Sequence, residues 1–171
     1  MKRALPAKEV FLKELISDSD LAGLQNRIEL ILKKHGLEKE VKIVVEDENA
    51  GFLPNSIFTK KLGIAESVVK YLRENLELPN MVVGELLHKT ANNVAVIYRK
   101  ATQKQAARFE KLDFEHKVPF EAFSDSRYTT FEAIALFYSQ QEMSLKQIAA
   151  ILHRDERTIW TTLQRARSKH D

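Results

Sequence analysis

The sequence predicts a mainly α-helical protein, in which two segments of three helices each follow a small α/β unit of two helices and one strand. Three observations lead to this fold class. Apolar residues recur at helical spacing through most of the chain after residue 54. Before that point, residues 41–46 alternate apolar and polar side chains as a strand does. The pattern of residues 54–104 then returns at 119–169.

Composition and charge narrow the class of protein. The chain has 171 residues, of which 44% are hydrophobic, enough to bury a core. It has no cysteine, which excludes disulfides and thiolate metal sites. Its apolar runs are too short for a membrane span, and its start regains charge too soon for a signal peptide. We therefore expect a cytoplasmic protein without a membrane partner. The net charge of +3 is too mild to identify a nucleic-acid partner by itself.

Residues 1–53 are predicted to form the N-terminal unit. Pro6 can open a helix over 6–16, and Ser19 or Asp20 can cap a second helix over 19–36, which Gly36 ends. The strand over 41–46 then needs a pairing partner. Its partner is either the same strand of a second molecule or an extended stretch at 1–5 or 52–58. This unit is therefore interpreted as a dimerisation or docking element, with a homodimer through residues 1–53 as one outcome.

Residues 119–171 are predicted to hold three helices. The first begins after a cap at Thr129 or Thr130 and ends near Gln141, Ser144 caps the second, and Asp155 caps the third. Each helix has an apolar face at helical spacing, formed by Phe131, Ile134, Ala135, Phe137 and Tyr138, by Leu145, Ile148, Ala149 and Leu152, and by Ile159, Leu163 and Ala166.

The junction between the second and third helices has the spacing of a helix-turn-helix. Only three residues separate the helices, and none of them is proline or glycine. Ala149 is small enough to let two crossing backbones approach, and Ile159 is a branched residue that can lock the helices together. His153 falls where a left-handed conformation is expected, which histidine tolerates better than most residues.

These residues resemble a known family. The stretch "MSLKQIAAILHRDERTIWTTLQRARSK" looks like region 4 of sigma-70-type factors, and more closely the stand-alone modules of that type. The resemblance covers Thr129–Lys169, about a quarter of the chain, and departs from the pattern at Gln147 and His153. It implies DNA binding and docking on RNA polymerase. The chain does not resemble a full sigma factor, because it lacks the aromatic-rich helix that melts promoters.

The resemblance also exposes a divergent second copy. A shift of 65 residues places His88 on His153, Gly84 on Ala149, Val94 on Ile159 and Ala101 on Ala166. The predicted domains are therefore the unit 1–53, a first helix-turn-helix at 54–104, a linker at 105–118 and a second helix-turn-helix at 119–171. Helical phase favours continuation of the first copy's third helix into the linker.

Glu66 and Glu132 recur at one position of the two copies when one further residue of offset is allowed. We expect each carboxylate to have a structural role, such as pairing with an arginine of the third helix.

In a docked helix-turn-helix, the start of the third helix faces base edges and the outer parts meet phosphates. For the second copy, the register of the sigma-type motif implies base reading by Glu156, Arg157, Trp160, Thr161 and Gln164. Phosphate contacts are expected from Ser144, Lys146, Arg154, Arg165, Arg167 and Lys169. The alternative for Trp160 is that its ring covers the seam between helices.

The first copy presents a more apolar and less cationic surface at the equivalent positions. Its candidate residues are Asn92, Asn93, Val96, Arg99 and Lys100. This copy either reads DNA weakly or binds protein. The first alternative is slightly favoured, and Asn92 is the residue that could read adenine.

The sequence shows no Gly-rich phosphate loop, nucleophile motif or histidine spacing for a metal, so we expect no enzyme, cofactor or metal site. The leading hypothesis is a transcription regulator that binds double-stranded DNA. The alternatives are an adaptor that docks on RNA polymerase or another transcription component, and a non-specific architectural or RNA-binding protein.

Overall fold

The computed structural model describes residues 30, 33–34, 49 and 51–169. The chain divides into two compact units, Met1–Gly51 and Phe52–Asp171. The helix expected over 6–16 and the strand expected over 41–46 lie outside the described residues. Of the helix expected over 19–36, only Leu30, Lys33 and Lys34 are described, and these are helical.

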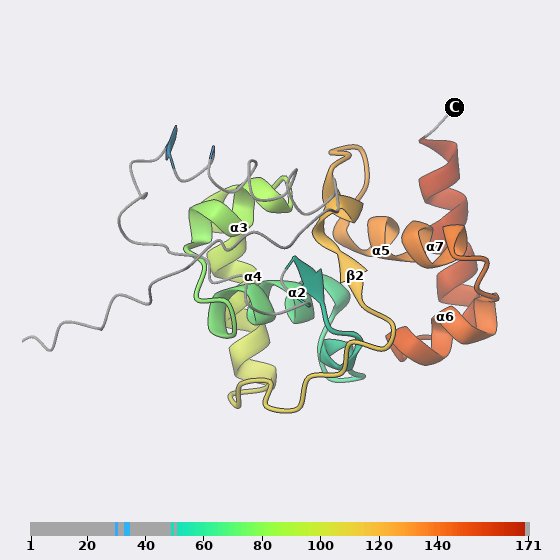
Figure 1. Ribbon diagram of the computed structural model, residues 1–171, viewed down its shortest axis with the longest axis horizontal. Coiled ribbons are helices and arrows are strands. Elements are labelled where there is room, and N and C mark those ends of the chain that lie inside the picture. The colour runs from blue at the N-terminus through green and yellow to red at the C-terminus, as the bar shows by residue number, and fades with distance from the viewer. Residues whose placement is uncertain (1–29, 31–32, 35–48, 50, 170–171) are drawn as a thin grey trace, which may run out of the picture. The chain divides into compact units, whose positions relative to one another are not determined.

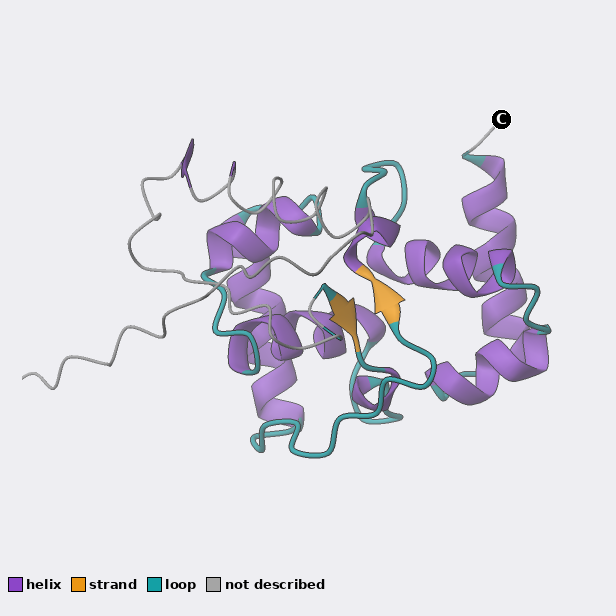
Figure 2. Cartoon of the chain, viewed as in Figure 1, coloured by secondary structure: helices purple, strands orange, loops and turns teal. Residues whose placement is uncertain are grey.

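The second unit is built mainly from helices, with two short strands side by side (Figures 1 and 2). The fold class predicted from the sequence, mainly α-helical, is therefore confirmed for residues 51–169. The elements in chain order are β1 (Phe52–Leu53), the 3-10 helix η1 (Asn55–Ile57), α2 (Ile64–Glu74), α3 (Asn80–Leu86), α4 (Ala91–Lys104), β2 (Val118–Pro119), the 3-10 helix η2 (Phe120–Phe123), α5 (Thr130–Gln140), α6 (Leu145–Leu152) and α7 (Glu156–Ser168).

The helices pack as two groups of three, which we call the first repeat (Phe52–Lys104) and the second repeat (Val118–Lys169). In the first, α4 packs against α2 and α3, and in the second, α7 packs against α5 and α6. The third helix of each repeat contributes a fully buried branched residue, Val94 or Ile159, and a fully buried alanine, Ala101 or Ala166. These are the positions that the sequence pattern assigned to the core.

Equivalent positions of the two repeats share unusual backbone conformations. Four described residues other than glycine have a positive φ: Glu77 at 55°, His88 at 53°, Glu142 at 59° and His153 at 50°. They form two pairs, each 65 residues apart. The left-handed conformation predicted for His153 is thus confirmed, and His88 adopts it as well. Left-handed residues allow the chain to leave one helix and enter the next within a few residues.

The predicted helix starts of the second repeat are confirmed. Thr129 precedes α5 and accepts a hydrogen bond from the Glu132 amide, while the Glu132 carboxylate accepts one from the Thr129 amide. Ser144 and Gln147 form the same reciprocal capping box at α6. Asp155 occupies the cap position of α7, although its side chain makes no capping hydrogen bond. The local signals for helix initiation therefore sit where the helices begin.

The repeats meet through equivalent elements. Strands β1 and β2 pair antiparallel, with Phe52 opposite Pro119 and Leu53 opposite Val118. Leu53 and Val118 are 65 residues apart, so the pair joins equivalent residues of the two repeats. The first helices, α2 and α5, also contact each other. Contacts between equivalent elements are typical of two copies related by an approximate two-fold axis.

The linker does not continue α4, and the prediction of a helix there is wrong. α4 ends at Lys104, and Gln105 is extended, with φ −146° and ψ 101°. The following segment instead hydrogen-bonds to the first repeat. The Asn75 side chain donates to the Phe109 carbonyl at 2.9 Å, and the backbone N–H of Asn55 donates to the Asp113 carbonyl at 2.9 Å. A continued helix would carry the chain away from β1, whereas this path brings β2 beside it.

We predict that Gly84→Ala destabilises the protein. A Cβ at this position would lie 2.5 Å from the Lys89 carbonyl oxygen, which is backbone and cannot swing away. Helix propensity alone would favour alanine by about 1 kcal/mol, but overpacking of this kind costs about 1–3 kcal/mol. Urea denaturation should therefore show a net loss of unfolding free energy.

Gly63→Ala is the matched control. Its Cβ would meet only the flexible Glu66 side chain, at 3.4 Å. Because Gly63 is the N-cap of α2, where alanine is less favourable than glycine, we expect a loss of unfolding free energy that is smaller than that of Gly84→Ala. A Gly84→Ala protein as stable as Gly63→Ala would show that α3 and the α4 entry do not cross tightly at Gly84.

Candidate nucleic-acid interface

The outer face of α7 presents most of the side chains expected to read bases. Glu156, Arg157, Trp160 and Gln164 are exposed, and Thr161 is half-buried. The opposite face, formed by Ile159, Thr162, Leu163 and Ala166, is buried against the rest of the repeat. Trp160 as a whole residue retains 53% of its accessible surface. The structure therefore places these five residues along one accessible strip of the helix.

The turn before α7 determines where this strip points. α6 ends at His153, whose left-handed conformation turns the chain, and the Arg154 amide donates to the Ala149 carbonyl at 3.0 Å. Asp155 then begins α7. Ile159 and Leu152 are completely buried, so the two helices are held together directly beyond the turn.

The residues expected to contact phosphate differ in their surroundings. Arg165 and Arg167 are exposed and have no ion-pair partner among the described residues, as is also true of Lys146. Ser144 is exposed, but its hydroxyl is engaged with Gln147. Lys169 forms an ion pair with Glu132 at 2.7 Å. Arg165, Arg167 and Lys146 are thus the cations of this set that remain available to a ligand.

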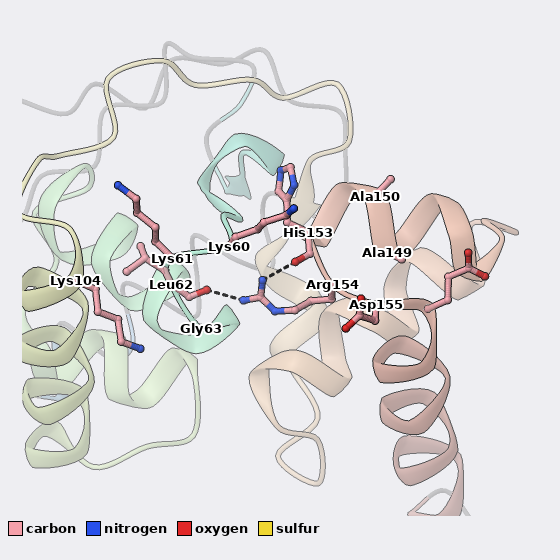
Figure 3. Close-up of a pocket in the computed structure, with 11 residues that line it drawn as sticks. Lys60, Lys61, Leu62, Gly63, Lys104, Ala149, Ala150, His153, Arg154 and Asp155 are labelled. Atoms are coloured by element: carbon pink, nitrogen blue, oxygen red, sulfur yellow. Dashed lines mark hydrogen bonds between the residues drawn. The ribbon is translucent and has the colours of Figure 1, made fainter.

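Arg154 points toward the first repeat. Its guanidinium donates to the Leu62 carbonyl at 2.5 Å and to the His153 carbonyl at 2.8 Å (Figure 3). It also donates to the carbonyls of Thr59 at 3.1 Å and Leu152 at 3.3 Å. Burial lowers the pKa of this guanidinium from its ordinary value, and the nearby Glu66 carboxylate opposes that effect. Arg154 therefore joins the repeats, a contact that the sequence analysis did not anticipate.

His88 makes the reciprocal contact from the first repeat. Its Nε2 lies 2.8 Å from the Phe123 carbonyl oxygen of η2. His88 and His153 occupy equivalent turns, so each turn is held against the opposite repeat, through His88 in one and through Arg154 in the other.

Glu66 and Glu132 have the structural role expected of them, but their partners are lysines rather than arginines. Lys104 Nζ lies 2.8 Å from the Glu66 carboxylate, and Lys169 Nζ lies 2.7 Å from that of Glu132. Burial tends to raise the pKa of the Glu132 carboxyl, but hydrogen bonds from Lys169 and Thr129 outweigh this, so its pKa is lowered. The pKa of Glu66 is lowered by the corresponding contacts. Lysine suits both sites because each lies where the third helix ends and cations are favoured.

The equivalent face of α4 is accessible but chemically different. Asn92, Asn93, Val96, Arg99 and Lys100 are all exposed, and Val96 retains 44% of its accessible surface. Thr90 caps the helix through the Asn93 amide. The exposed Val96 of α4 occupies the position that Thr161 has near the middle of the α7 strip.

A groove of about 890 Å³ lies beside the first turn of α7, between the repeats (Figure 3). We call it the basic groove. The first repeat lines it with Lys60, Lys61, Leu62, Gly63 and Lys104, and the second repeat with Ala149, Ala150, His153, Arg154, Asp155 and Glu156. Lys60 and Lys61 were missed by the sequence analysis. The sequence feature that could have indicated them is the pair of adjacent lysines before the first helix of the first repeat. The equivalent positions of the second repeat are Asp125 and Ser126.

No protein-family model, curated protein or solved structure matches this chain. Among the described residues, no group of three or more His, Cys, Asp or Glu side chains could hold a metal ion, and no helix is long and apolar enough to cross a membrane.

We predict that Glu132→Gln lowers stability at neutral pH by roughly 1 kcal/mol, because it removes the charge that pairs with Lys169. The lowered pKa of Glu132 means that its stabilising contribution is complete above the ordinary value of 4.5. That contribution is lost as the pH falls below 4.5 through the folded-state pKa. Melting curves from pH 7 to pH 3 should therefore converge for wild type and variant at the acid end.

Glu110→Gln, at an exposed position of the linker, is the control for this experiment. Its melting temperature should follow that of the wild type across the range. A constant difference between Glu132→Gln and wild type at every pH would contradict the role of the charge.

We predict that Arg154→Ala destabilises the second unit by roughly 1.5–3 kcal/mol, since it removes the donors of the Thr59 and Leu62 carbonyls. Arg157→Ala is a matched control, because Arg157 is exposed and has no ion-pair partner among the described residues. We expect it to change the unfolding free energy by less than about 0.5 kcal/mol. Equal stabilities of the two variants in urea denaturation would argue against the bridge.

Proposed function

We propose that this protein binds double-stranded DNA with sequence preference and regulates transcription, with α7 in the major groove. The observation that carries the proposal is the accessible strip of α7. It begins with Glu156 and Arg157, continues through Trp160 and Gln164, and is followed by Arg165 and Arg167, all of them exposed. Arg157 can donate twice to a guanine, and Glu156 can accept from a cytosine amine.

The geometry around α6 and α7 supports a helix-turn-helix. Two helices are joined by a turn that contains a left-handed residue, His153. The small residue Ala149 lies at their crossing, and Ile159 is fully buried between them. In this motif the third helix enters the major groove with its N-terminal residues toward base edges, and cations further along contact phosphates. The exposed residues of α7 follow that order.

The paired repeats support a reader of two half-sites. The contacts between β1 and β2 and between α2 and α5 join equivalent elements, as subunits do in a two-fold symmetric dimer. Dimeric helix-turn-helix proteins place two third helices in successive major grooves roughly 34–36 Å apart. In this proposal, α7 reads one half-site and α4 reads a second half-site more weakly.

The exposed Val96 favours a second candidate function for the first repeat. An apolar residue at the centre of the α4 face suits a protein partner better than a base edge. An adaptor that docks on RNA polymerase or another transcription component would use this face. In that case α7 alone would contact DNA.

Selection of bound sequences from a random duplex pool, at near-physiological salt, tests the proposal. We predict that wild-type protein recovers a motif and that Arg157→Ala relaxes its preference at one base pair. The variant should lose about 1–3 kcal/mol of binding free energy on the preferred site. A motif with two halves would include α4 in the reading surface, whereas a single half-site would favour the adaptor role for the first repeat.

Arg165→Ala is the comparison that separates base reading from phosphate contact. It should weaken binding to all sequences alike and reduce the slope of log affinity against log salt by about one. If the folded wild-type protein enriches no sequence, the proposal of sequence-specific binding fails. Equal losses for Arg157→Ala on every duplex would remove Arg157 from the reading surface.

A further inference from the structure

The basic groove carries two lysines that no internal contact occupies. Lys60 and Lys61 are exposed, and neither has a hydrogen bond or an ion pair among the described residues. The other two cations of the groove are engaged, since Lys104 pairs with Glu66 and Arg154 binds carbonyls of the first repeat. Lys60 and Lys61 are therefore the cations that the groove offers to a ligand.

The second repeat lacks this feature in its equivalent loop. The loop after η1, which holds Lys60 and Lys61, corresponds to the loop after η2 with Asp125, Ser126 and Arg127. There, the Arg127 guanidinium pairs with the Asp125 carboxylate at 2.6 Å. The loop facing the α6–α7 turn is thus doubly cationic, whereas its counterpart is neutralised internally. This asymmetry concentrates free positive charge beside α7.

We propose that Lys60 and Lys61 bind the phosphodiester backbone of the same DNA duplex whose major groove receives α7. The inference rests on the proposed function and extends it, because it makes the first repeat part of the surface on which the second repeat binds DNA. The bridge from Arg154 to Thr59 and Leu62 fixes the loop that carries these lysines against the turn before α7. The lysines and the start of α7 would then approach the duplex together.

The lining of the groove fits a duplex better than a free anion. Asp155 and Glu156 line the groove with the lysines, and their negative charge opposes the binding of a small phosphate. A duplex presents phosphates beside base edges, where a cytosine amine can donate to a carboxylate. Glu156 is also one of the residues at the start of α7 that we expect to face bases. The mixed charge of the groove therefore matches both parts of a DNA surface.

The test is the salt dependence of DNA binding by the full chain, measured from 50 to 200 mM salt on the selected duplex. Loss of two phosphate contacts in Lys60→Ala/Lys61→Ala should make the slope of log affinity against log salt shallower by about two. The affinity ratio of wild type to variant should accordingly fall about tenfold over this range. The preferred sequence should stay unchanged, and the melting temperature should confirm that the variant is folded.

Two further variants separate a local contact from a general effect of charge. Lys60→Arg/Lys61→Arg keeps the charge and should keep the wild-type slope. Lys61→Ala and Arg127→Ala each remove one positive charge from equivalent loops, but only Lys61→Ala should make the slope shallower, by about one. Equal reductions for Lys61→Ala and Arg127→Ala would overturn the proposal, since net charge alone would then explain them.

The outcomes also separate this inference from the proposed function. Wild-type binding with an unchanged slope in Lys60→Ala/Lys61→Ala would overturn the inference and leave α7 as a DNA reader. A reduced slope without any sequence preference in the wild type would support the groove contact and contradict sequence-specific reading. No DNA binding by the folded wild type at low salt would overturn both.

Discussion

The orientation of α7 relative to the first repeat depends on the Arg154 guanidinium. This group belongs to the second repeat and donates hydrogen bonds to the Thr59 and Leu62 carbonyls of the first. Arg154 lies between the left-handed turn residue and the cap of α7, so a fixed Arg154 fixes the turn. His88 holds the opposite turn against Phe123. Because each turn contacts the other repeat, the surface that α7 presents is a property of the pair, and neither repeat determines it alone.

The two repeats share a backbone pattern but differ in chemistry, and the difference extends below the surface. Lys70 of α2 is completely buried and pairs with Glu74, which also accepts a hydrogen bond from the Tyr98 hydroxyl. The matching positions in the second repeat are Leu136, Gln140 and Leu163. The first repeat thus has a polar cluster between α2 and α4, whereas the second repeat has leucines at two of the three positions, of which Leu163 is buried and Leu136 half-buried. The contact between the first and third helices is therefore polar in the first repeat and has no counterpart of this kind at the matching residues of the second.

The sequence predicted the features that depend on residues close together in the chain, such as helix caps and the turn residue. Caps at Thr129, Ser144 and Asp155, the left-handed His153 and the buried Ile159 all depend on residues within one or two helical turns. The structure departs from the sequence prediction where distant contacts decide. The linker looked helical by its apolar phase, but hydrogen bonds from Asn55 and Asn75 draw it back over the first repeat. Arg154 was predicted on the surface because its acceptors, about 90 residues away in sequence, are backbone carbonyls that leave no mark in the side-chain pattern.

Under the proposed function, joining two equivalent repeats in one chain would affect how the protein binds DNA. Two separate subunits must associate before they present two third helices, so their DNA affinity depends on protein concentration. Here β1 pairs with β2 inside one chain, and the association is intramolecular. Because the two halves have different sequences, their exposed side chains can differ at equivalent positions. The neutralised loop at Asp125 and Arg127 and the free lysines at 60 and 61 illustrate such a difference, which a symmetric homodimer could not accommodate. The shared backbone pattern therefore gives α4 and α7 equivalent places in their repeats, while their outer faces differ in chemistry, with the exposed Val96 of α4 at the position of Thr161 in α7.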